Sequence, residues 1–212
     1  RPKTLSIGFP SSGSTPNWRS SAAIRTPSTA DSRRGSEGRK EGVVDTVHTI
    51  AVGREAMACQ FEVIFNILDN DEAAACGVDA LDAIAEIEEL ITVYRPTSEL
   101  SRINAAAGDG WQGVSQDVFD LLLLARDLYE RTGGSFDATA GPLIRVWGFL
   151  RRAGRRPSPE EPDAARACSG MHLVEFDEPR RRIRFQRPGV ELNLGAIGKG
   201  WAIDRAIDRV AA

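Results

Sequence analysis

The sequence predicts an α+β fold, in which antiparallel strands and packed helices form a single mixed domain. Two neighbouring segments alternate apolar and polar residues, as half-buried antiparallel strands do. Two longer segments carry apolar residues at helical spacing. Strands and helices do not alternate strictly, as a doubly wound parallel sheet would require. The length of 212 residues, 42% of them hydrophobic, suits one domain with a tail.

Residues 1–42 are predicted to be a disordered basic tail. Ser, Thr, Pro and Gly supply 21 of the first 40 positions, and a segment so poor in apolar residues cannot offset its ordering entropy. Eight basic and two acidic residues give these 40 positions a net charge of +6, against −9 for the remainder. The composition fits an organelle transit peptide and lacks the apolar core of a secretory signal. Translated upstream DNA is a third interpretation.

The domain is therefore expected over residues 43–212, and its first elements are clearly patterned. Residues 43–52 and 59–68 are predicted strands, and the second has one apolar face: Phe61, Val63, Phe65 and Ile67. Residues 71–92 are a predicted helix with an apolar stripe of Leu81, Ile84, Ile87 and Ile91, and with Asp82, Glu86 and Glu89 in water. Pro96 follows it, and Thr97 or Ser98 is expected to cap a short helix through Asn104.

The second half of the domain contains another long helix and a hairpin. The broad apolar surface of residues 116–131 predicts a central, well-covered helix that ends at Gly133-Gly134. Trp147 and Phe149 are expected in the core. Residues 171–176 and 183–186 are predicted to form a hairpin, and 190–194 a further strand. The sequence stops at Ala212 inside a predicted helix that carries the apolar residues Trp201, Ile203 and Ile207, so we expect a domain incomplete at its C-terminus.

Composition argues against several classes of site and partner. A formal charge of −3 gives no reason to expect nucleic acid or an acidic membrane as the main partner. The three cysteines have no CxxC spacing, and two histidines cannot build a histidine-rich metal cluster. We expect no transmembrane segment, since no stretch reaches about 18 consecutive apolar residues.

The strongest local signal is the segment VELNLGAIGKGWAIDRA at residues 190–206, a strand, a glycine-rich loop and a helix. Unpartnered N–H groups at a helix start, approached closely because of the glycines, suit an anionic ligand, and Lys199 adds a positive charge. A P-loop is excluded, because it would need Gly at Asn193 and a hydroxyl residue at Gly200. Taken alone, such a loop is more often a tight strand-to-helix turn than a ligand site.

Four segments in order resemble the FAD:protein FMN transferases, the thiamine-biosynthesis lipoprotein ApbE family. They are MACQFEVIF at 57–65, TVYRPTSELSRIN at 92–104, GGSFDATAGPLIRVWGF at 133–149 and ELNLGAIGKGWAID at 191–204. The resemblance covers about 150 residues. It implies an enzyme that, with Mg2+, splits the diphosphate of FAD, transfers FMN to a Ser or Thr hydroxyl of an acceptor flavoprotein and releases AMP.

The resemblance also implies site residues. Met57 would border the flavin and Tyr94 would stack on its isoalloxazine ring, where an aromatic face suits a planar cofactor. The flavin-binding stretch would be Phe136, Asp137 and Ala138, although Asp137 could equally serve its own turn. Asn193 and Lys199 would contact the nucleotide and act in catalysis, and the carbonyl of Ala196 would be a Mg2+ ligand.

Two departures from the family pattern leave alternatives open. The family usually has Asp at the position of Asn193, and Asn retains an acceptor oxygen without the negative charge. The family's other metal-binding Asp and Thr are expected beyond the last helix matched here. An FAD-binding protein without turnover, or an inactive fragment of the family, therefore remains an alternative to the enzyme. Family members are often periplasmic or membrane-anchored, but no signal peptide is visible in this N-terminus.

Overall fold

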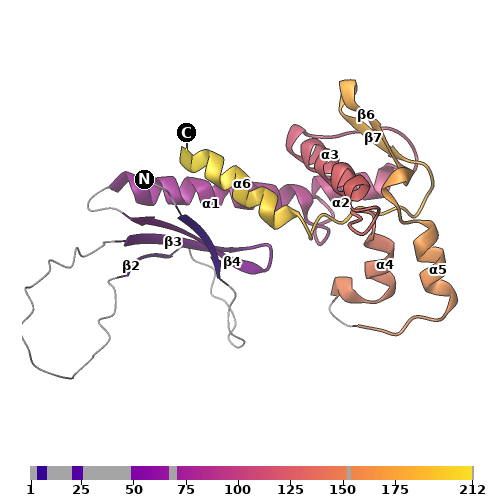
Figure 1. Ribbon diagram of the computed structural model, residues 1–212, viewed down its shortest axis with the longest axis horizontal. Coiled ribbons are helices and arrows are strands. Elements are labelled where there is room, and N and C mark those ends of the chain that lie inside the picture. Colours follow the sequence, from indigo (N-terminus) through magenta and orange to yellow (C-terminus); the bar gives the residue numbers. More distant parts are fainter. Residues whose placement is uncertain (1–3, 9–20, 26–48, 67–70, 152–153, 212) are drawn as a thin grey trace, which may run out of the picture. The chain divides into compact units, whose positions relative to one another are not determined.

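A computed structural model describes residues 4–8, 21–25, 49–66, 71–151 and 154–211 (Figure 1). Helices and antiparallel strands are mixed along the chain, so the predicted α+β class is confirmed. The chain divides into two compact units. Unit 1 comprises Arg1–Ile84 and Ile203–Ala212, and unit 2 comprises Ala85–Ala202.

Unit 1 contains a four-stranded antiparallel sheet in the order β1-β4-β3-β2. The central strands β3 (Thr49–Ala56) and β4 (Cys59–Asn66) form the predicted pair. Met57 and Ala58 connect them with positive φ angles of 50° and 58°, the geometry of a tight hairpin turn. Phe61, Val63 and Phe65 are buried on one face as predicted, whereas residues 43–48 and Ile67 lie outside the described residues.

The two edge strands come from the segment for which composition predicts disorder. β1 (Thr4–Gly8) pairs with β4, and β2 (Ser21–Arg25) pairs with β3. At these two segments the structure has strands where the composition predicts a tail. The rest of residues 1–48 lies outside the described residues.

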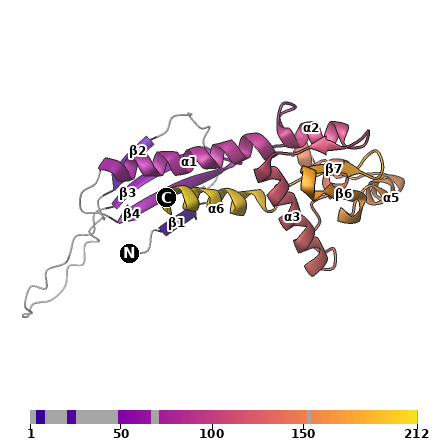
Figure 2. The same cartoon turned by 90° about the horizontal axis from the view of Figure 1, so that it is seen from above.

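The helices α1 (Asp71–Ile91) and α6 (Gly198–Ala211) each cross the boundary between the units, and their parts within unit 1, residues 71–84 and 203–211, lie side by side (Figure 2). An ion pair of 2.9 Å joins Asp79 to Arg209, and Gly77 of α1 lies against Val52 and Phe65 of the sheet. Two predictions for α1 are confirmed: its stripe Leu81, Ile84, Ile87 and Ile91 is buried, and Asp82, Glu86 and Glu89 are exposed.

Of the apolar residues predicted for α6, Trp201 and Ile203 are half-buried but Ile207 is not covered. Ile207 is 46% exposed, and the buried positions are Ala202, Ala206 and Val210. These residues recur every four positions, so one line of the helix surface is buried.

Unit 2 contains four further helices and a small sheet. The helices are α2 (Glu99–Ala106), α3 (Gln116–Arg131), α4 (Gly141–Val146) and α5 (Glu160–Ala167). The strands are β5 (Gln112–Gly113), β6 (Val174–Asp177) and β7 (Arg182–Phe185), in the antiparallel order β5-β7-β6. Short 3-10 turns occupy Phe149–Arg151, Met171–Leu173 and Glu178–Arg180. The predicted hairpin over 171–186 is confirmed.

Three expectations about burial and pairing in unit 2 are wrong. Helix α3 has the predicted bounds and buries Val118, Leu121, Leu122 and Ala125, but Leu124 is 37% exposed, so the helix is not covered on all sides. Trp147 and Phe149 are 40% and 63% exposed rather than in the core. The predicted strand 190–194 has one isolated parallel bridge, between Glu191 and Ala140.

Candidate functional site

Two of the predicted site segments meet in unit 2. The N–H of Asn193 donates to the carbonyl of Ala138 at 2.7 Å, next to the Ala140–Glu191 bridge. Gly141 permits this approach, because a Cβ there would lie 2.6 Å from the carbonyl oxygen of Glu191. The flavin-binding stretch and the glycine-rich loop expected from the sequence are therefore adjacent, although 55 positions separate Ala138 from Asn193.

Asp137 has the turn-forming role that the sequence left open. Its Oδ1 accepts hydrogen bonds from the N–H of Thr139 at 2.8 Å and from the Thr139 hydroxyl at 2.6 Å. The Thr139 hydroxyl also accepts from the N–H of Gly170 at 2.5 Å and is fully buried. Phe136 is half-buried, and its N–H donates to the Thr132 hydroxyl at 3.0 Å. These bonds fix the backbone of the stretch.

A bidentate ion pair joins α4 to the segment before the loop. The Arg145 guanidinium donates to Glu191 through Nε at 3.0 Å and Nη2 at 2.7 Å. Hydrogen bonding to Glu191 raises the pKa of Arg145 above its ordinary value, and burial opposes this in part. The pair lies at the surface, so we expect it to orient α4 more than to stabilise the fold.

Asn104, which no sequence pattern singles out as a site residue, holds the other side of this segment. Asn104, near the end of α2, accepts from the N–H of Leu192 at 2.8 Å and donates to its carbonyl at 2.9 Å. Leu192 and Leu194 are fully buried. Asn104 is the last residue of the stretch 92–104 that resembles the family, but nothing in the spacing of that stretch indicates a partner 88 residues away.

The loop itself is a compact turn into α6. The side chain of Asn193 accepts from the N–H of Gly195 at 3.0 Å, and the N–H groups of Ile197 and Gly198 donate to the Leu194 carbonyl at 3.2 Å and 2.8 Å. Ala196 is exposed between them. Lys199 is half-buried in the first turn of α6. The N–H groups of Gly195, Ile197 and Gly198 are used within the turn, so it is the lysine and the helix N-terminus that favour a negatively charged ligand.

The loop that carries Tyr94 follows the end of α1 and is held by the cap of α2. Tyr94 is 70% exposed, so its ring is available to a ligand. Ser98 caps α2 as predicted: its hydroxyl accepts from the N–H of Ser101 at 3.0 Å and donates to the carbonyl of Thr92 at 2.5 Å. Gly198 lies against Ile91, since a Cβ there would be 2.3 Å from the Ile91 Cδ1. The start of α6 thus packs on the helix end from which the Tyr94 loop leaves.

Met57 is the one predicted site residue that belongs to unit 1. It lies half-buried at the tip of the β3–β4 hairpin, where its positive φ angle makes the turn. The other predicted residues, Tyr94, Phe136, Asp137, Ala138, Asn193, Ala196 and Lys199, all belong to unit 2.

The described residues supply little of a metal site. The Ala196 carbonyl is a suitable oxygen donor for Mg2+, and the hydrogen bonds of the turn use the carbonyls of Leu194 and Ile197 on either side of it. Across residues 49–66, 71–151 and 154–211 no three His, Cys, Asp or Glu side chains lie close enough to hold a metal ion. Ala196 fits as one ligand of such an ion and no more.

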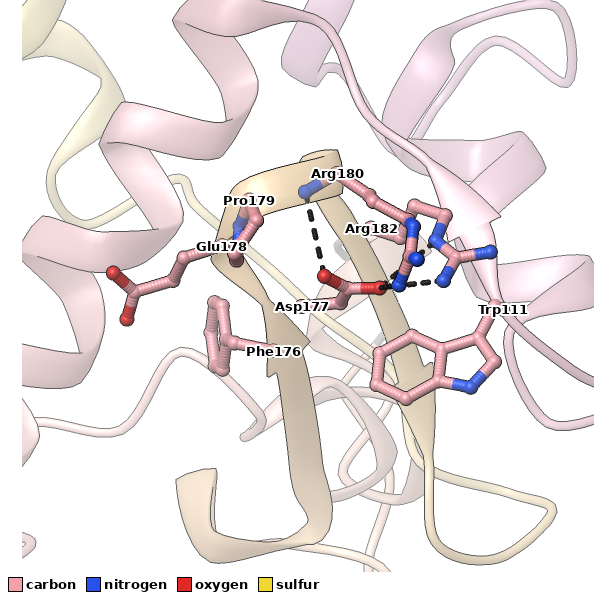
Figure 3. A pocket seen from close by; sticks show the side chains of 7 residues that line it. All are labelled: Trp111, Phe176, Asp177, Glu178, Pro179, Arg180 and Arg182. Carbon is pink, nitrogen blue, oxygen red and sulfur yellow. Dashed lines mark hydrogen bonds and ion pairs between the residues drawn. The ribbon is translucent and has the colours of Figure 1, made fainter.

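An open groove of about 700 Å³ lies elsewhere in unit 2, at the tip of the β6–β7 hairpin (Figure 3). The Arg182 and Arg184 guanidinium groups stack on the Trp111 indole, 5.5 Å and 4.9 Å from the ring centroid. Hydrogen bonds from Arg182 and then Arg180 hold the pKa of Asp177 below its ordinary value. None of the predicted site residues lines this groove, whose lining residues are Trp111, Phe176, Asp177, Glu178, Pro179, Arg180 and Arg182.

Comparison with known sequences decides the family. The sequence profile of the ApbE family matches residues 55–212, which is most of the chain. The chain belongs to the ApbE family. It is 34% identical over 146 residues to an FAD:protein FMN transferase of Klebsiella pneumoniae, covering 69% of this chain and 46% of that protein. Against the enzyme of the same name from Vibrio cholerae, identity is 33% over 127 residues, 59% of this chain and 37% of that protein.

Solved ApbE structures share the fold. The ApbE protein of Thermotoga maritima superimposes with a TM-score of 0.69 at 26% identity, over 76% of this chain and 52% of that one. The flavinyl transferase ApbE of Pseudomonas stutzeri gives 0.68 at 25% identity, over 76% and 52%. The chain thus spans about half the length of these structures, and less than half of the two relatives above. None of the helices in the described part of the chain has both the length and the apolar character to cross a bilayer.

Proposed function

We propose that this chain carries the flavin- and diphosphate-binding part of an FAD:protein FMN transferase. The observation that supports this most directly is the junction in unit 2, where the Asn193 N–H meets the Ala138 carbonyl at 2.7 Å. It joins two segments that the family resemblance assigns to the two halves of one dinucleotide. The relatives that match this chain are named FAD:protein FMN transferase, which supports the same proposal.

Each half of FAD has residues suited to it. Tyr94 presents an exposed ring for stacking on the isoalloxazine, beside the stretch Phe136 to Ala138. The N-terminus of α6 and the Lys199 ammonium suit the diphosphate, whose negative charge they would oppose. Met57 would contribute an apolar contact to the flavin.

The reaction is phosphoryl transfer. An oxygen of a Ser or Thr hydroxyl on the acceptor protein attacks the phosphorus on the riboflavin side of the diphosphate. The bond from that phosphorus to the bridging oxygen breaks, AMP leaves with this oxygen, and the hydroxyl proton is released. Protein groups in such reactions act mainly by positioning and charge neutralisation, which fits a helix N-terminus with one lysine.

A bound Mg2+ would neutralise charge on the diphosphate in this reaction. Among the described residues, the Ala196 carbonyl would be its ligand, and octahedral coordination leaves positions for phosphate oxygens and water. Asn193, together with Lys199, would contact the nucleotide beside it.

The test is covalent flavin transfer. The protein is incubated with FAD, Mg2+ and an acceptor flavoprotein, and a denaturing gel is viewed for flavin fluorescence. We expect a fluorescent acceptor band that depends on FAD and is lost when the acceptor hydroxyl is removed. Isothermal titration with FAD accompanies the gel, and the absence of both binding and transfer would contradict the proposal.

One observation favours a second candidate, an FAD-binding protein without turnover. The Asn193 carboxamide oxygen is already engaged by the N–H of Gly195 at 3.0 Å, and the side chain carries no negative charge for a metal. Binding of FAD in the titration, with no fluorescent acceptor on the gel, would favour this candidate. Restoration of transfer by Asn193→Asp would then identify the missing charge as the cause.

A further inference from the structure

The segment before the glycine-rich loop has an unusual partner. Leu192 is fully buried, and a buried main-chain N–H or carbonyl is costly unless it is hydrogen-bonded. Leu192 belongs to no strand in the structure. Both of its main-chain groups instead bond to one carboxamide, that of Asn104, at 2.8 Å and 2.9 Å. A carboxamide has the donor and acceptor of a peptide group, so Asn104 takes the place of a neighbouring strand.

This clamp lies directly beside the proposed diphosphate site. Asn193 follows Leu192, and its N–H donates across to Ala138 on the flavin-binding stretch at 2.7 Å. The segment is therefore held from two sides, by Asn104 at one residue and by Ala138 at the next. The turn that leads to Lys199 begins two residues later.

The same helix is attached to the Tyr94 loop at its other end. Ser98, the cap of α2, donates to the Thr92 carbonyl at 2.5 Å, and the Ser101 hydroxyl donates to the same carbonyl at 3.3 Å. Six residues of helix separate Ser98 from Asn104, a rise of about 9 Å. Helix α2 thus connects the loop that presents the aromatic ring to the segment that leads to Lys199.

We propose that Asn104 is a positioning residue that, through Leu192, sets the place of the 193–199 loop relative to the Tyr94 loop. The inference rests on the proposed function for its ligand. Asn104 touches neither half of FAD in this proposal and acts only through the main chain of Leu192. Its loss would therefore affect binding of the nucleotide half much more than binding of the isolated flavin.

The variant Asn104→Ala removes both bonds, and Gln112→Ala is its matched control. The Gln112 amide also donates to main-chain carbonyls of unit 2, those of Ala106 at 3.2 Å and Gly110 at 3.3 Å, but not to the loop. Affinities for FAD, AMP and riboflavin are measured by fluorescence and calorimetry. We expect Asn104→Ala to bind FAD and AMP about tenfold more weakly, in line with two lost hydrogen bonds, and riboflavin within twofold of wild type. Gln112→Ala is expected to match wild type for all three.

A second variant separates positioning from folding. Asn104→Asp keeps the acceptor for the Leu192 N–H but places a carboxylate oxygen opposite the Leu192 carbonyl. Protonation restores a donor there, so its deficit in FAD affinity should shrink as the pH falls from about 7.5 towards about 5. A deficit that does not change with pH, or an equal loss for riboflavin and AMP in Asn104→Ala, would overturn the inference.

Amide hydrogen exchange, measured on the ligand-free proteins, tests the role of Asn104 separately from the proposed function. Exchange over residues 190–196 should be faster in Asn104→Ala than in wild type and unchanged in Gln112→Ala. Wild-type protein that binds no FAD would overturn the proposed function, whatever the exchange shows. FAD binding by wild type with unchanged exchange in Asn104→Ala would overturn only the role of Asn104.

Discussion

Tyr94 combines high exposure with a fixed loop, which is unusual for an aromatic residue without a ligand. The side chain is 70% exposed, while Ser98 and Ser101 hold the carbonyl of Thr92 two residues before it. A ring held in water on an ordered loop loses little conformational freedom when it stacks on a ligand.

Replacing Tyr94 with Ala should weaken FAD binding by about 1 kcal/mol or more, because the stacking surface is lost. Calorimetry measures the affinity, and Tyr94→Phe, which keeps the ring, should stay close to wild type. Phe149→Ala, which removes another exposed aromatic residue of unit 2, serves as the control. Unchanged affinity in Tyr94→Ala would contradict the flavin assignment.

Thr139 is the buried polar residue on which the flavin-binding stretch depends. Thr139→Val keeps the shape of the side chain but leaves the Gly170 N–H and one Asp137 oxygen without this partner. The free energy of unfolding should fall by about 1–3 kcal/mol, the usual cost of a buried unsatisfied group. Urea denaturation measures it. Thr97→Val, at an exposed threonine, should change stability by less than about 0.5 kcal/mol.

At the scale of elements, close main-chain approach replaces regular sheet pairing next to the site. Gly141 begins α4 where the carbonyl of Glu191 passes, and a Cβ would lie 2.6 Å from that oxygen. The extended segment 191–194 can therefore lie beside residues 138–140 with one bridge and one hydrogen bond.

Gly141→Ala should destabilise the protein by about 1–3 kcal/mol, because the main chain has to move to admit the methyl group. It should also weaken FAD binding, since the two site segments separate. Gly110→Ala is the matched control, because a Cβ there meets nothing within 4 Å. Equal unfolding free energies for the two variants would show that the approach is looser than the structure indicates.

The β6–β7 hairpin predicts a pH dependence. Arg182 and Arg180 lower the pKa of Asp177, so its ionised form stabilises the folded state at pH values above the unfolded carboxyl pKa of about 3.9. This contribution is lost as the pH falls through the lowered folded pKa. Asp177→Asn should therefore have a lower Tm than wild type at pH 7, with a difference that shrinks as the pH falls below about 4. Thermal unfolding followed by circular dichroism measures the difference.

A control variant tests the cause of this effect. The partner of Asp120 is the neutral amide of Gln116, at 2.7 Å. Asp120→Asn should therefore show little pH-dependent difference in Tm. A difference as large as that of Asp177→Asn would argue against the arginine pairing as the cause.

At the scale of the whole molecule, the predicted site residues are unevenly divided between the two units. Met57 belongs to unit 1, and the other predicted site residues belong to unit 2. Saturating FAD should stabilise the protein by about 2.7 kcal/mol at a concentration of 100 Kd. Hydrogen exchange should show protection over residues 92–98, 136–141 and 192–200, with riboflavin protecting the first two segments and AMP the third. Protection confined to the hairpin groove at Trp111 and Phe176 would contradict the proposed site.

The sequence by itself determined those elements whose apolar spacing and capping or turn residues all lie within one segment. The bounds of α3, the Ser98 cap and the buried faces of β4 and α1 follow from side-chain periodicity and turn chemistry within one segment. The family, too, was evident from four segments in order. Periodicity could not show how much of each helix surface other elements cover. The exposure of Leu124 and Ile207 was therefore not predicted, and Trp147 and Phe149 were wrongly expected in the core.

Only the tertiary structure decided how the site is assembled. Leu192 bonds to a carboxamide 88 residues away, and Thr139 bonds to Gly170, because buried main-chain groups take whichever partner the fold brings near. The apolar pattern of residues 190–194 predicts a strand. In the structure, the main-chain groups of this segment bond to the Asn104 side chain and form one isolated bridge, and they do not pair with a neighbouring strand. Local sequence specifies which backbone groups need partners, and long-range packing specifies which groups meet them.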